Sequence, residues 1–240
     1  MRPALHTMLL LLCLAPAVSA CRPETQSPLA RAVVLGRAEE VATLLAGGAS
    51  PNERTARGLT ALGLAARNGQ VAVVEQLIRA GADPDIRDAN ENQWTPLLNA
   101  THTHQLVSVD ALLRLGADPD LGSGLTPLMM AAGSGDDRIV KRLLDGGADP
   151  YIKMKSGENA LGAAVSGAPD LDEWTVGKCH TTTVKLLLDR APDLRLEMIW
   201  SARPVMWLAR FRDCAEVMRM VSGRHSEGFL VKDNRPGAPR

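Results

Sequence analysis

Aromatic residues are scarce in this chain of 240 residues: four Trp, two Phe and one Tyr make up 3% of it. Net charge is lacking as well, because 27 basic residues balance 27 acidic ones. A neutral chain has no basic field of the kind that binds nucleic acid or anionic membranes, so neither is expected as a partner. A core with so few rings has to be built from Ala, Leu and Val, which is typical of small helices stacked closely together.

Motifs for metal binding or catalysis are also lacking. None of the cysteines forms a C-x-x-C pair or stands at zinc-ligand spacing with a histidine. His102 and His104 flank a single residue and have the spacing of two metal ligands, but the favoured interpretation is two turn histidines with ordinary hydrogen bonds. His180 follows Cys179 directly, and adjacent side chains usually point apart, so a nucleophile and its base are not expected here. We therefore expect no enzyme, no cofactor, no metal and no small-molecule substrate.

The only extended apolar run lies at the start of the chain. Arg2, the apolar residues 8–18 and the small residues Ser19 and Ala20 have the three-part layout of a secretory signal. This run of 11 residues is too short for a transmembrane helix, which needs about 20. We expect residues 1–20 to be a signal peptide and the protein to be exported.

The stretch Val18-Ser19-Ala20-Cys21 resembles a bacterial lipobox. The resemblance implies that Cys21 is acylated and holds the protein on a membrane facing the periplasm; Arg22 after it weakly favours the outer membrane. Two or three acyl chains, at about 0.8 kcal/mol per buried methylene, make such an anchor effectively permanent. Residues 21–26 would then be a short linker. The alternative is ordinary cleavage after Ala20, which leaves a soluble periplasmic protein with a free Cys21 thiol.

Two motifs recur through the rest of the chain. The first has Leu at its third position and recurs at intervals of 33, 35, 31 and 33 residues: Ser27-Pro28-Leu29, Thr60-Ala61-Leu62, Thr95-Pro96-Leu97, Thr126-Pro127-Leu128 and Asn159-Ala160-Leu161. The second ends on a glycine 21 residues after each of the first four starts: Gly48, Gly81, Gly116 and Gly147. All variation in length falls in the connectors of 12, 14, 10 and 12 residues that follow. An invariant body with variable connectors is typical of a rigid stack.

Each 21-residue body predicts two short helices. In the second unit, Leu62 and Ala66 lie before a break at Gly69, and Val74 and Leu77 follow it at helical spacing. Thr or Ser before the first turn, and Pro within it, are helix start signals. The glycine of the second motif supplies a left-handed residue at the end of the pair. Such a pair cannot bury its apolar stripe alone, so the pairs are expected to stack.

These motifs, together with Ala-Ala-x-x-Gly and Val-Val-x-x-Leu-Leu between them, resemble the ankyrin-repeat family. The resemblance implies an all-α solenoid of about six helix-turn-helix units over residues 27–221, with β-hairpin fingers as connectors. It also implies a non-enzymatic protein that binds a protein partner with its fingers and first helices. The last unit lacks the motifs and is expected to be a cap, and residues 222–240 are expected to be disordered.

The fifth unit is longer than the others by an insertion at residues 167–178. The insertion is acidic and carries Trp174, which we interpret as a specificity element; a side chain that merely covers the groove between helices is nearly as well supported. Cys179 at the end of the insertion is a candidate disulfide partner of Cys214, provided that their Cα atoms lie within about 7 Å. Two independent cysteines are the alternative.

Trp94, in the longest connector, is the strongest candidate for a partner contact, because exposed Trp is enriched among interface anchors. Corresponding surface positions are expected to carry the other candidate contacts: Arg57, Leu59, Arg67, Asn68, Leu125, Lys155 and Glu158. Two functions fit this sequence. The first is a protein–protein interaction module, a scaffold or adaptor in the bacterial cell envelope; the second is an immunity or inhibitor lipoprotein that blocks a toxic envelope-acting enzyme.

Overall fold

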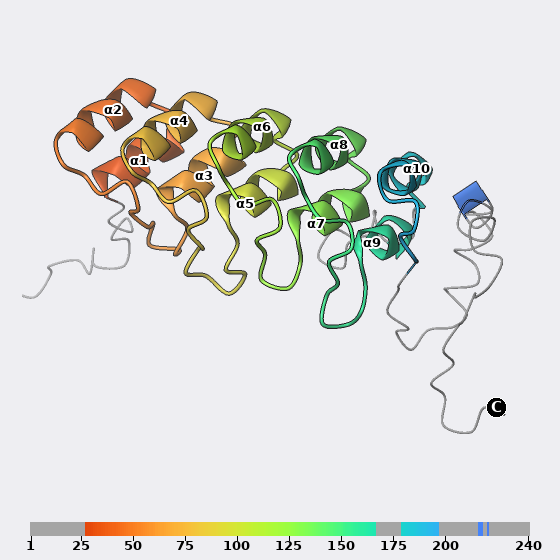
Figure 1. The fold of residues 1–240 in the computed structure, drawn as a ribbon. Coiled ribbons are helices and arrows are strands. Elements are labelled where there is room, and N and C mark those ends of the chain that lie inside the picture. The colour runs from red at the N-terminus through yellow and green to blue at the C-terminus, as the bar shows by residue number, and fades with distance from the viewer. Residues whose placement is uncertain (1–26, 167–178, 197–215, 218–219, 221–240) are drawn as a thin grey trace, which may run out of the picture.

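The computed structural model describes residues 27–166, 179–196, 216–217 and 220. Within these residues, ten helices follow one another as five pairs (Figure 1). The first helices of the pairs are α1 (Pro28–Val34), α3 (Ala61–Arg67), α5 (Pro96–His102), α7 (Pro127–Ser134) and α9 (Ala160–Ser166). The second helices are α2 (Ala38–Ala46), α4 (Val71–Arg79), α6 (Leu106–Arg114), α8 (Asp137–Asp145) and α10 (Thr181–Arg190).

A polar residue directly before each first helix caps its start, as the sequence predicts. The side-chain oxygen of this residue accepts from the backbone N–H three positions on, at 2.9–3.3 Å, in all five pairs: Ser27, Thr60, Thr95, Thr126 and Asn159. Such a cap stabilises a helix by about 1 kcal/mol. Because the caps stand at matching positions, the five first helices start in register.

The helices form two layers, with the first helices beside the connectors and the second helices behind them (Figure 1). Each first helix packs against the next one, from α1 to α9, so the core is continuous along the array. One leucine of each repeated motif lies on this seam and is 0–1% exposed: Leu29, Leu62, Leu97, Leu128 and Leu161. Burying a leucine contributes about 1.5–3 kcal/mol relative to leaving it in water.

The second helices cross-link the units on their outer side through ion pairs. Arg114 on α6 lies 3.8 Å from Glu75 on α4, and Arg142 on α8 lies 2.6 Å from Asp110 on α6. Arg190 on α10 pairs with Asp145 on α8. Exposed pairs of this kind contribute at most about 1 kcal/mol each, so the stack depends mainly on its apolar seam.

In the first four pairs the turn between the helices has a residue with positive φ, and the next unit packs against it. The four turn residues are Gly36, Gly69, His104 and Gly135, with φ of 67°, 72°, 58° and 70°. A Cβ at Gly69 would lie 2.5 Å from Gln105 Oε1 of the next unit, and a Cβ at Gly135 would overlap the His180 ring. Gly69 and Gly135 thus leave space for these side chains of the next unit and adopt the positive φ without strain.

The connectors of the described residues contain isolated antiparallel bridges and no extended strand. One bridge joins Arg54 to Thr60 and another joins Lys153 to Asn159. Fully formed β-hairpin fingers therefore stay a prediction. So does the sixth unit, most of which lies outside the described residues, although Val217 and Met220 pack against the core. The insertion 167–178 and the segments 1–26 and 222–240 lie outside the described residues too.

Candidate binding surfaces

In the third and fifth units, the residue directly before the helix cap lies beside the last turn of the first helix, eight positions later. Trp94 and His102 show this most clearly, because their ring centroids are 4.7 Å apart with the planes tilted by 55°. Glu158 and Ser166 repeat the arrangement, because Ser166 Oγ donates to Glu158 Oε1 at 2.6 Å. We call the four residues at this position the inner line: Leu59, Trp94, Leu125 and Glu158.

Trp94 is half-buried rather than exposed. Its ring packs against the core as well as against His102. Trp94 is therefore less exposed than its place in the longest connector predicts, because the helix end brings His102 directly beside it. The rings form a fixed aromatic surface at the centre of the inner line. Trp94 keeps its place as a candidate contact, with a structural role added.

Two other inner-line residues are buried where the sequence predicts surface. Leu125 is 7% exposed and belongs to the core, since the third connector is the shortest and draws its end onto the helices. Glu158 is 4% exposed. Burial raises the pKa of its carboxyl, and the hydrogen bond from Ser166 opposes this only in part. The expectation of an exposed side chain is therefore wrong at both positions.

The remaining candidate contacts surround the inner line. Four of them are exposed: Arg57, Arg67, Asn68 and Lys155. Leu59 is half-buried. The end of α3 is tied to the next unit, because Thr103 Oγ1 donates to the Arg67 carbonyl at 2.8 Å. Trp174 lies outside the described residues, so its role stays a prediction.

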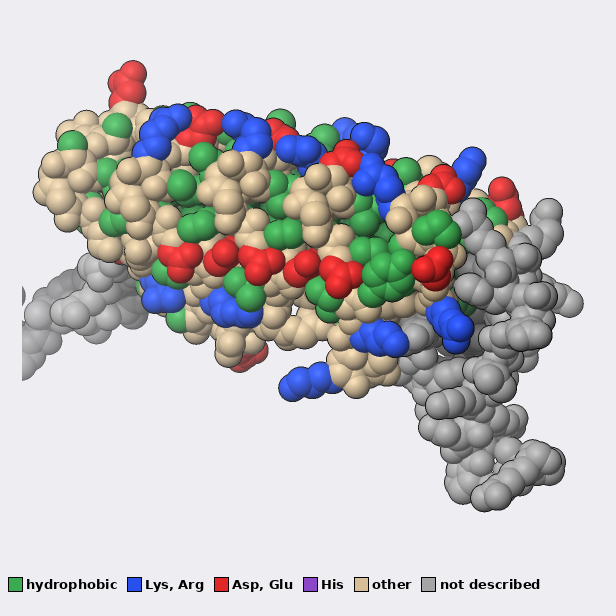
Figure 2. Space-filling model, viewed as in Figure 1, with side chains coloured by type: hydrophobic (Ala, Val, Ile, Leu, Met, Phe, Trp, Pro, Cys, Tyr) green, Lys and Arg blue, Asp and Glu red, His purple; other side chains and the backbone are tan. Residues whose placement is uncertain are grey.

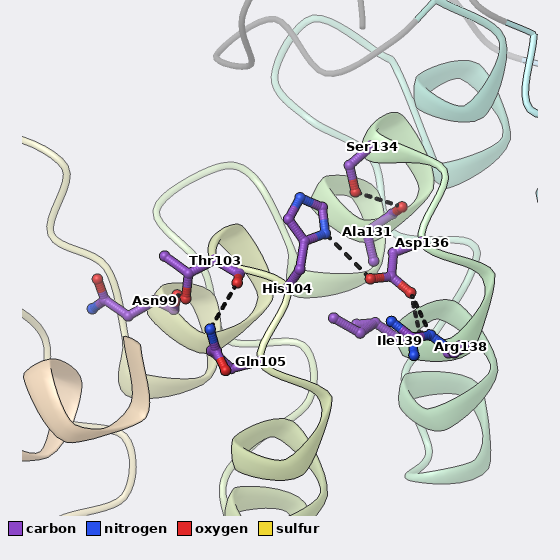
Figure 3. A network of polar contacts seen from close by, with 9 residues as sticks. All are labelled: Asn99, Thr103, His104, Gln105, Ala131, Ser134, Asp136, Arg138 and Ile139. Carbon is purple, nitrogen blue, oxygen red and sulfur yellow. Dashed lines mark hydrogen bonds and ion pairs between the residues drawn. The ribbon is translucent and has the colours of Figure 1, made fainter. Parts of the chain in front are cut away.

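The turn of the third unit carries a histidine where the other turns have glycine. His104 Nδ1 lies 3.2 Å from Asp136 Oδ2, and Asp136 Oδ1 accepts from Ile139 N at the start of α8 (Figure 3). Arg138 lies 3.8 Å from the same carboxylate. Asp136 is shorter than the Gln or His that the other units place here, which leaves room for the imidazole. No group of three possible metal ligands occurs among the described residues.

Cys179 and His180 lie at the start of α10. His180 Nε2 lies 3.2 Å from the Gly133 carbonyl, so its ring holds α10 against the end of α7. Cys179 is disulfide-bonded, and a disulfide sulfur is not an attacking thiolate. Cys214 lies outside the described residues, as do the other two cysteines, so the pairing of Cys179 with Cys214 stays a prediction.

A second polar surface runs along the bend where each second helix ends and the connector begins. Its carboxylates stand two or four residues after the glycine of the second motif: Asp83, Asp85, Asp118, Asp120 and Asp149. We call these five residues the aspartate row. Asp85 Oδ1 accepts from Asp118 N at 2.9 Å, and Asp120 Oδ1 accepts from Asp149 N at 2.9 Å. The row therefore links each unit to the next.

An asparagine in the first unit makes the same link without a charge. Asn52 Oδ1 accepts from Asp83 N at 3.0 Å, as Asp85 and Asp120 do one and two units later. Partial burial raises the pKa of Asp85 and of Asp120, and neighbouring carboxylates add to the effect. The charge at Asp85 and Asp120 is thus not needed for the hydrogen bonds between units.

Two further lines run beside the aspartate row (Figure 2). The apolar line consists of the partly exposed Ile86, Leu121 and Ile152, each five residues after the glycine of the second motif. The basic line consists of Arg54, Arg87 and Lys153. Arg54 Nη2 donates to the Arg87 carbonyl at 2.9 Å, and Arg87 Nη2 donates to the Gly122 carbonyl at 3.1 Å. The sequence analysis missed this surface, although the repeated Asp-Pro-Asp after each glycine was a signal for it.

Comparison with known proteins shows the family. A family model described as ankyrin repeats matches residues 5–88, 29–123 and 108–198. The chain therefore belongs to the ankyrin-repeat family, whose members are protein-interaction modules and generally not enzymes. No helix among the described residues has the length and apolar character needed to span a bilayer.

Three curated relatives match about half of this chain. It is 34% identical over 134 residues to a putative ankyrin repeat-containing protein of Treponema pallidum, covering 55% of this chain and 45% of the relative. It is 35% identical over 132 residues to a mitochondrial disaggregase of Bos taurus, and 30% over 166 residues to that of Homo sapiens. Each of these two matches covers 54% of this chain, but only 20% and 23% of the disaggregases. The chain thus spans less than half the length of these relatives.

Proposed function

We propose that this protein is an adaptor of the bacterial cell envelope that binds one protein partner along its inner line. The observation that carries the proposal is the change of chemistry from unit to unit at one repeated position. Leu59, Trp94, Leu125 and Glu158 share a backbone position but differ in chemistry: the half-buried Leu59 and Trp94 present an aliphatic and an aromatic group, whereas the buried Leu125 and Glu158 support the surface around them. A purely structural position in a repeat would be filled by similar residues.

The centre of this surface is the Trp94–His102 ring pair. Trp is the residue type most enriched among interface anchors, and anchors lie on rigid, partly buried supports. Packing against His102 and the core fixes the Trp94 ring before a partner arrives, so little side-chain entropy is lost on binding. The exposed Arg67, Asn68 and Lys155 supply polar groups around it.

Site-specific photocrosslinking in cells tests the proposal. A photoreactive residue at Asn68 or Lys155 is expected to capture one protein, and Trp94→Ala is expected to remove that product. The same residue at Lys141 on α8 or Lys185 on α10, both exposed on the outer layer, is the matched control and is expected to capture nothing in common. Equal capture from the two layers would contradict an inner-line site. A captured toxic enzyme would show the inhibitor role instead of the adaptor role.

The envelope location rests on the sequence of residues 1–26, which lie outside the described residues. The first family match begins at residue 5, inside the segment proposed as a signal peptide, so the two interpretations of this segment compete. Mass spectrometry of the mature N-terminus decides between them. A diacylated or triacylated Cys21 at the N-terminus supports the lipoprotein, and Cys21→Ser should then release the protein from membranes. A mature chain that keeps residues 5–20 would contradict the leader.

A further inference from the structure

The aspartate row, the apolar line and the basic line form one face with a definite order of chemistry. Figure 2 shows carboxylates in a row across this face, with lysine and arginine side chains along a second line nearer the connector tips and apolar side chains between. Each line takes its residues from three of the four connectors, at fixed distances after the same glycine: the aspartate row and the apolar line from the second to fourth connectors, and the basic line from the first, second and fourth. The face therefore repeats with the period of the array, unlike the inner line.

We infer that this face binds a second copy of the chain, with a two-fold axis running along the apolar line. A rotation about that axis places the aspartate row of one copy over the basic line of the other, and the reverse. The two arrays then lie parallel, and each unit faces the same unit of its partner. A two-fold axis across the array would instead oppose aspartates to aspartates. Self-complementarity of one patch is the requirement for an isologous dimer.

Partners of a single charge fit this face poorly. A cationic segment over the aspartate row would approach Arg54, Arg87 and Lys153, and an anionic segment over the basic line would approach the aspartates. Like charges brought together across an interface cost several kcal/mol. The matching surface is one that carries both signs, on the two sides of an apolar line and with the same period. The chain itself carries this pattern, and its net charge of zero allows copies to approach each other.

The fold does not need the negative charges of the aspartate row for the hydrogen bonds between units. Asn52 shows that an amide makes the link between units at 3.0 Å, yet Asp85 and Asp120 hold carboxylates at the equivalent places. Tyr151 takes the same position in the fourth unit and leaves its ring 48% exposed beside Asp149. This exposed ring would lie over the basic line of the second copy.

Sedimentation of the purified full-length chain measures the association directly. A dimer that weakens with added salt is expected, because charge pairs at an interface rim are screened. The amide variant Asp83→Asn, Asp85→Asn, Asp118→Asn, Asp120→Asn and Asp149→Asn keeps every hydrogen-bond acceptor of the row, and it should dissociate at least about tenfold more readily. The control Glu39→Gln with Glu91→Gln removes exposed charges elsewhere and should associate like the wild type. A wild-type chain that stays monomeric at its highest soluble concentration would overturn the inference.

Cysteine crosslinking tests the geometry of the proposed dimer. Ile152→Cys places a thiol beside the two-fold axis and should crosslink two copies under mild oxidation, whereas Lys141→Cys on α8 should not. Charge reversal adds a second test that separates pairing from misfolding. Asp85→Lys with Asp149→Lys, and Arg87→Glu with Lys153→Glu, reverse the two lines within the same second and fourth units; each variant should be monomeric alone, but the two should associate when mixed. Two monomeric variants that stay apart on mixing, although both fold, would refute the pairing of the two lines.

Discussion

The inner line and the aspartate row lie in the same repeat units, but residue types recur from unit to unit in the aspartate row and change in the inner line. The aspartate row has Asp at the same two places in successive units, each with the same hydrogen bond to the next unit. At the inner line, Trp94 and Glu158 occupy one position with opposite chemistry. A surface that changes in every unit suits an irregular partner, whereas a surface that repeats suits a partner with the same period. The two surfaces are therefore expected to respond differently to mutation.

The largest loss of stability is expected from a substitution in the seam between the first helices, and this loss is the reference for substitutions on the two surfaces. Leu128→Ala should lower the free energy of unfolding by about 2–5 kcal/mol, because Leu128 is 0% exposed and truncation leaves a cavity. Leu121→Ala in the partly exposed apolar line is the matched control and should cost well under that. Chemical denaturation measures both. Similar losses would mean that the apolar line is part of the core.

At the inner line, Trp94→Ala should affect both stability and binding. The half-buried ring and its contact with His102 contribute about 1–2 kcal/mol to folding, and loss of an anchor should weaken partner binding by about 2 kcal/mol or more. Val107→Ala, at a residue that is 57% exposed on α6, should change neither by more than about 0.5 kcal/mol. A Trp94→Ala variant that binds normally would leave the ring with a structural role only.

The turn of the third unit offers a test away from both surfaces. Alanine at position 104 keeps a side chain at positive φ and loses the contact with Asp136, whereas glycine adopts that backbone without strain. His104→Ala should therefore be about 1 kcal/mol less stable than His104→Gly. Thermal unfolding of the two variants side by side gives the difference. Equal stability would show that the positive φ at this position carries no cost.

Glu158→Gln tests the buried carboxylate of the inner line. Because burial raises the pKa of Glu158, the protonated form is favoured in the folded chain. The stabilising effect of this proton is complete below the ordinary carboxyl pKa of about 4 and is lost as the pH rises through the raised value. Glutamine keeps an acceptor for Ser166, so the variant should be more stable than wild type at pH 7 and similar near pH 4. A difference that does not change with pH would contradict this account.

Replacing carboxylates by amides in the aspartate row should have the smallest effect on stability. The pKa values of Asp85 and Asp120 are raised, first by partial burial and then by neighbouring carboxylates. Folding therefore favours the protonated form of both aspartates, and their charged forms lower the stability of the fold above about pH 4. Asp85→Asn with Asp120→Asn should raise the melting temperature slightly at pH 7 in dilute, monomeric protein, and not at pH 3. A lower melting temperature at pH 7 would show that the charges do stabilise the monomer.

The sequence predicts the parts of this molecule that depend on neighbours along the chain. Ser27, Thr95 and Thr126 cap helices as their spacing indicates, and the Pro that follows each of them lies in the first turn. Periodicity likewise places Leu62 and Leu97 in the core. These features need only the local helical geometry and the recurrence of the motif.

The burial of side chains at the inner line could not be predicted in this way, because it depends on contacts that the motif spacing does not encode. Leu125 is buried since its connector is short, and Trp94 is half-buried since His102 happens to stand eight residues later. Glu158 is buried beside Ser166 in the same way. The motif gives these residues one shared position, but each side chain meets a different neighbour there. Exposure could therefore not be read from the repeat alone.

The packing of each turn against the next unit also limits how this array can evolve by duplication. Gly69 fits beneath Gln105 and Gly135 beneath His180, whereas His104 fits only beside the shorter Asp136. A third unit duplicated in front of a unit with Gln before its second helix would bring the imidazole of His104 against that Gln side chain. The steric match at this junction therefore favours keeping the third unit directly before the fourth, even though every unit has the same fold.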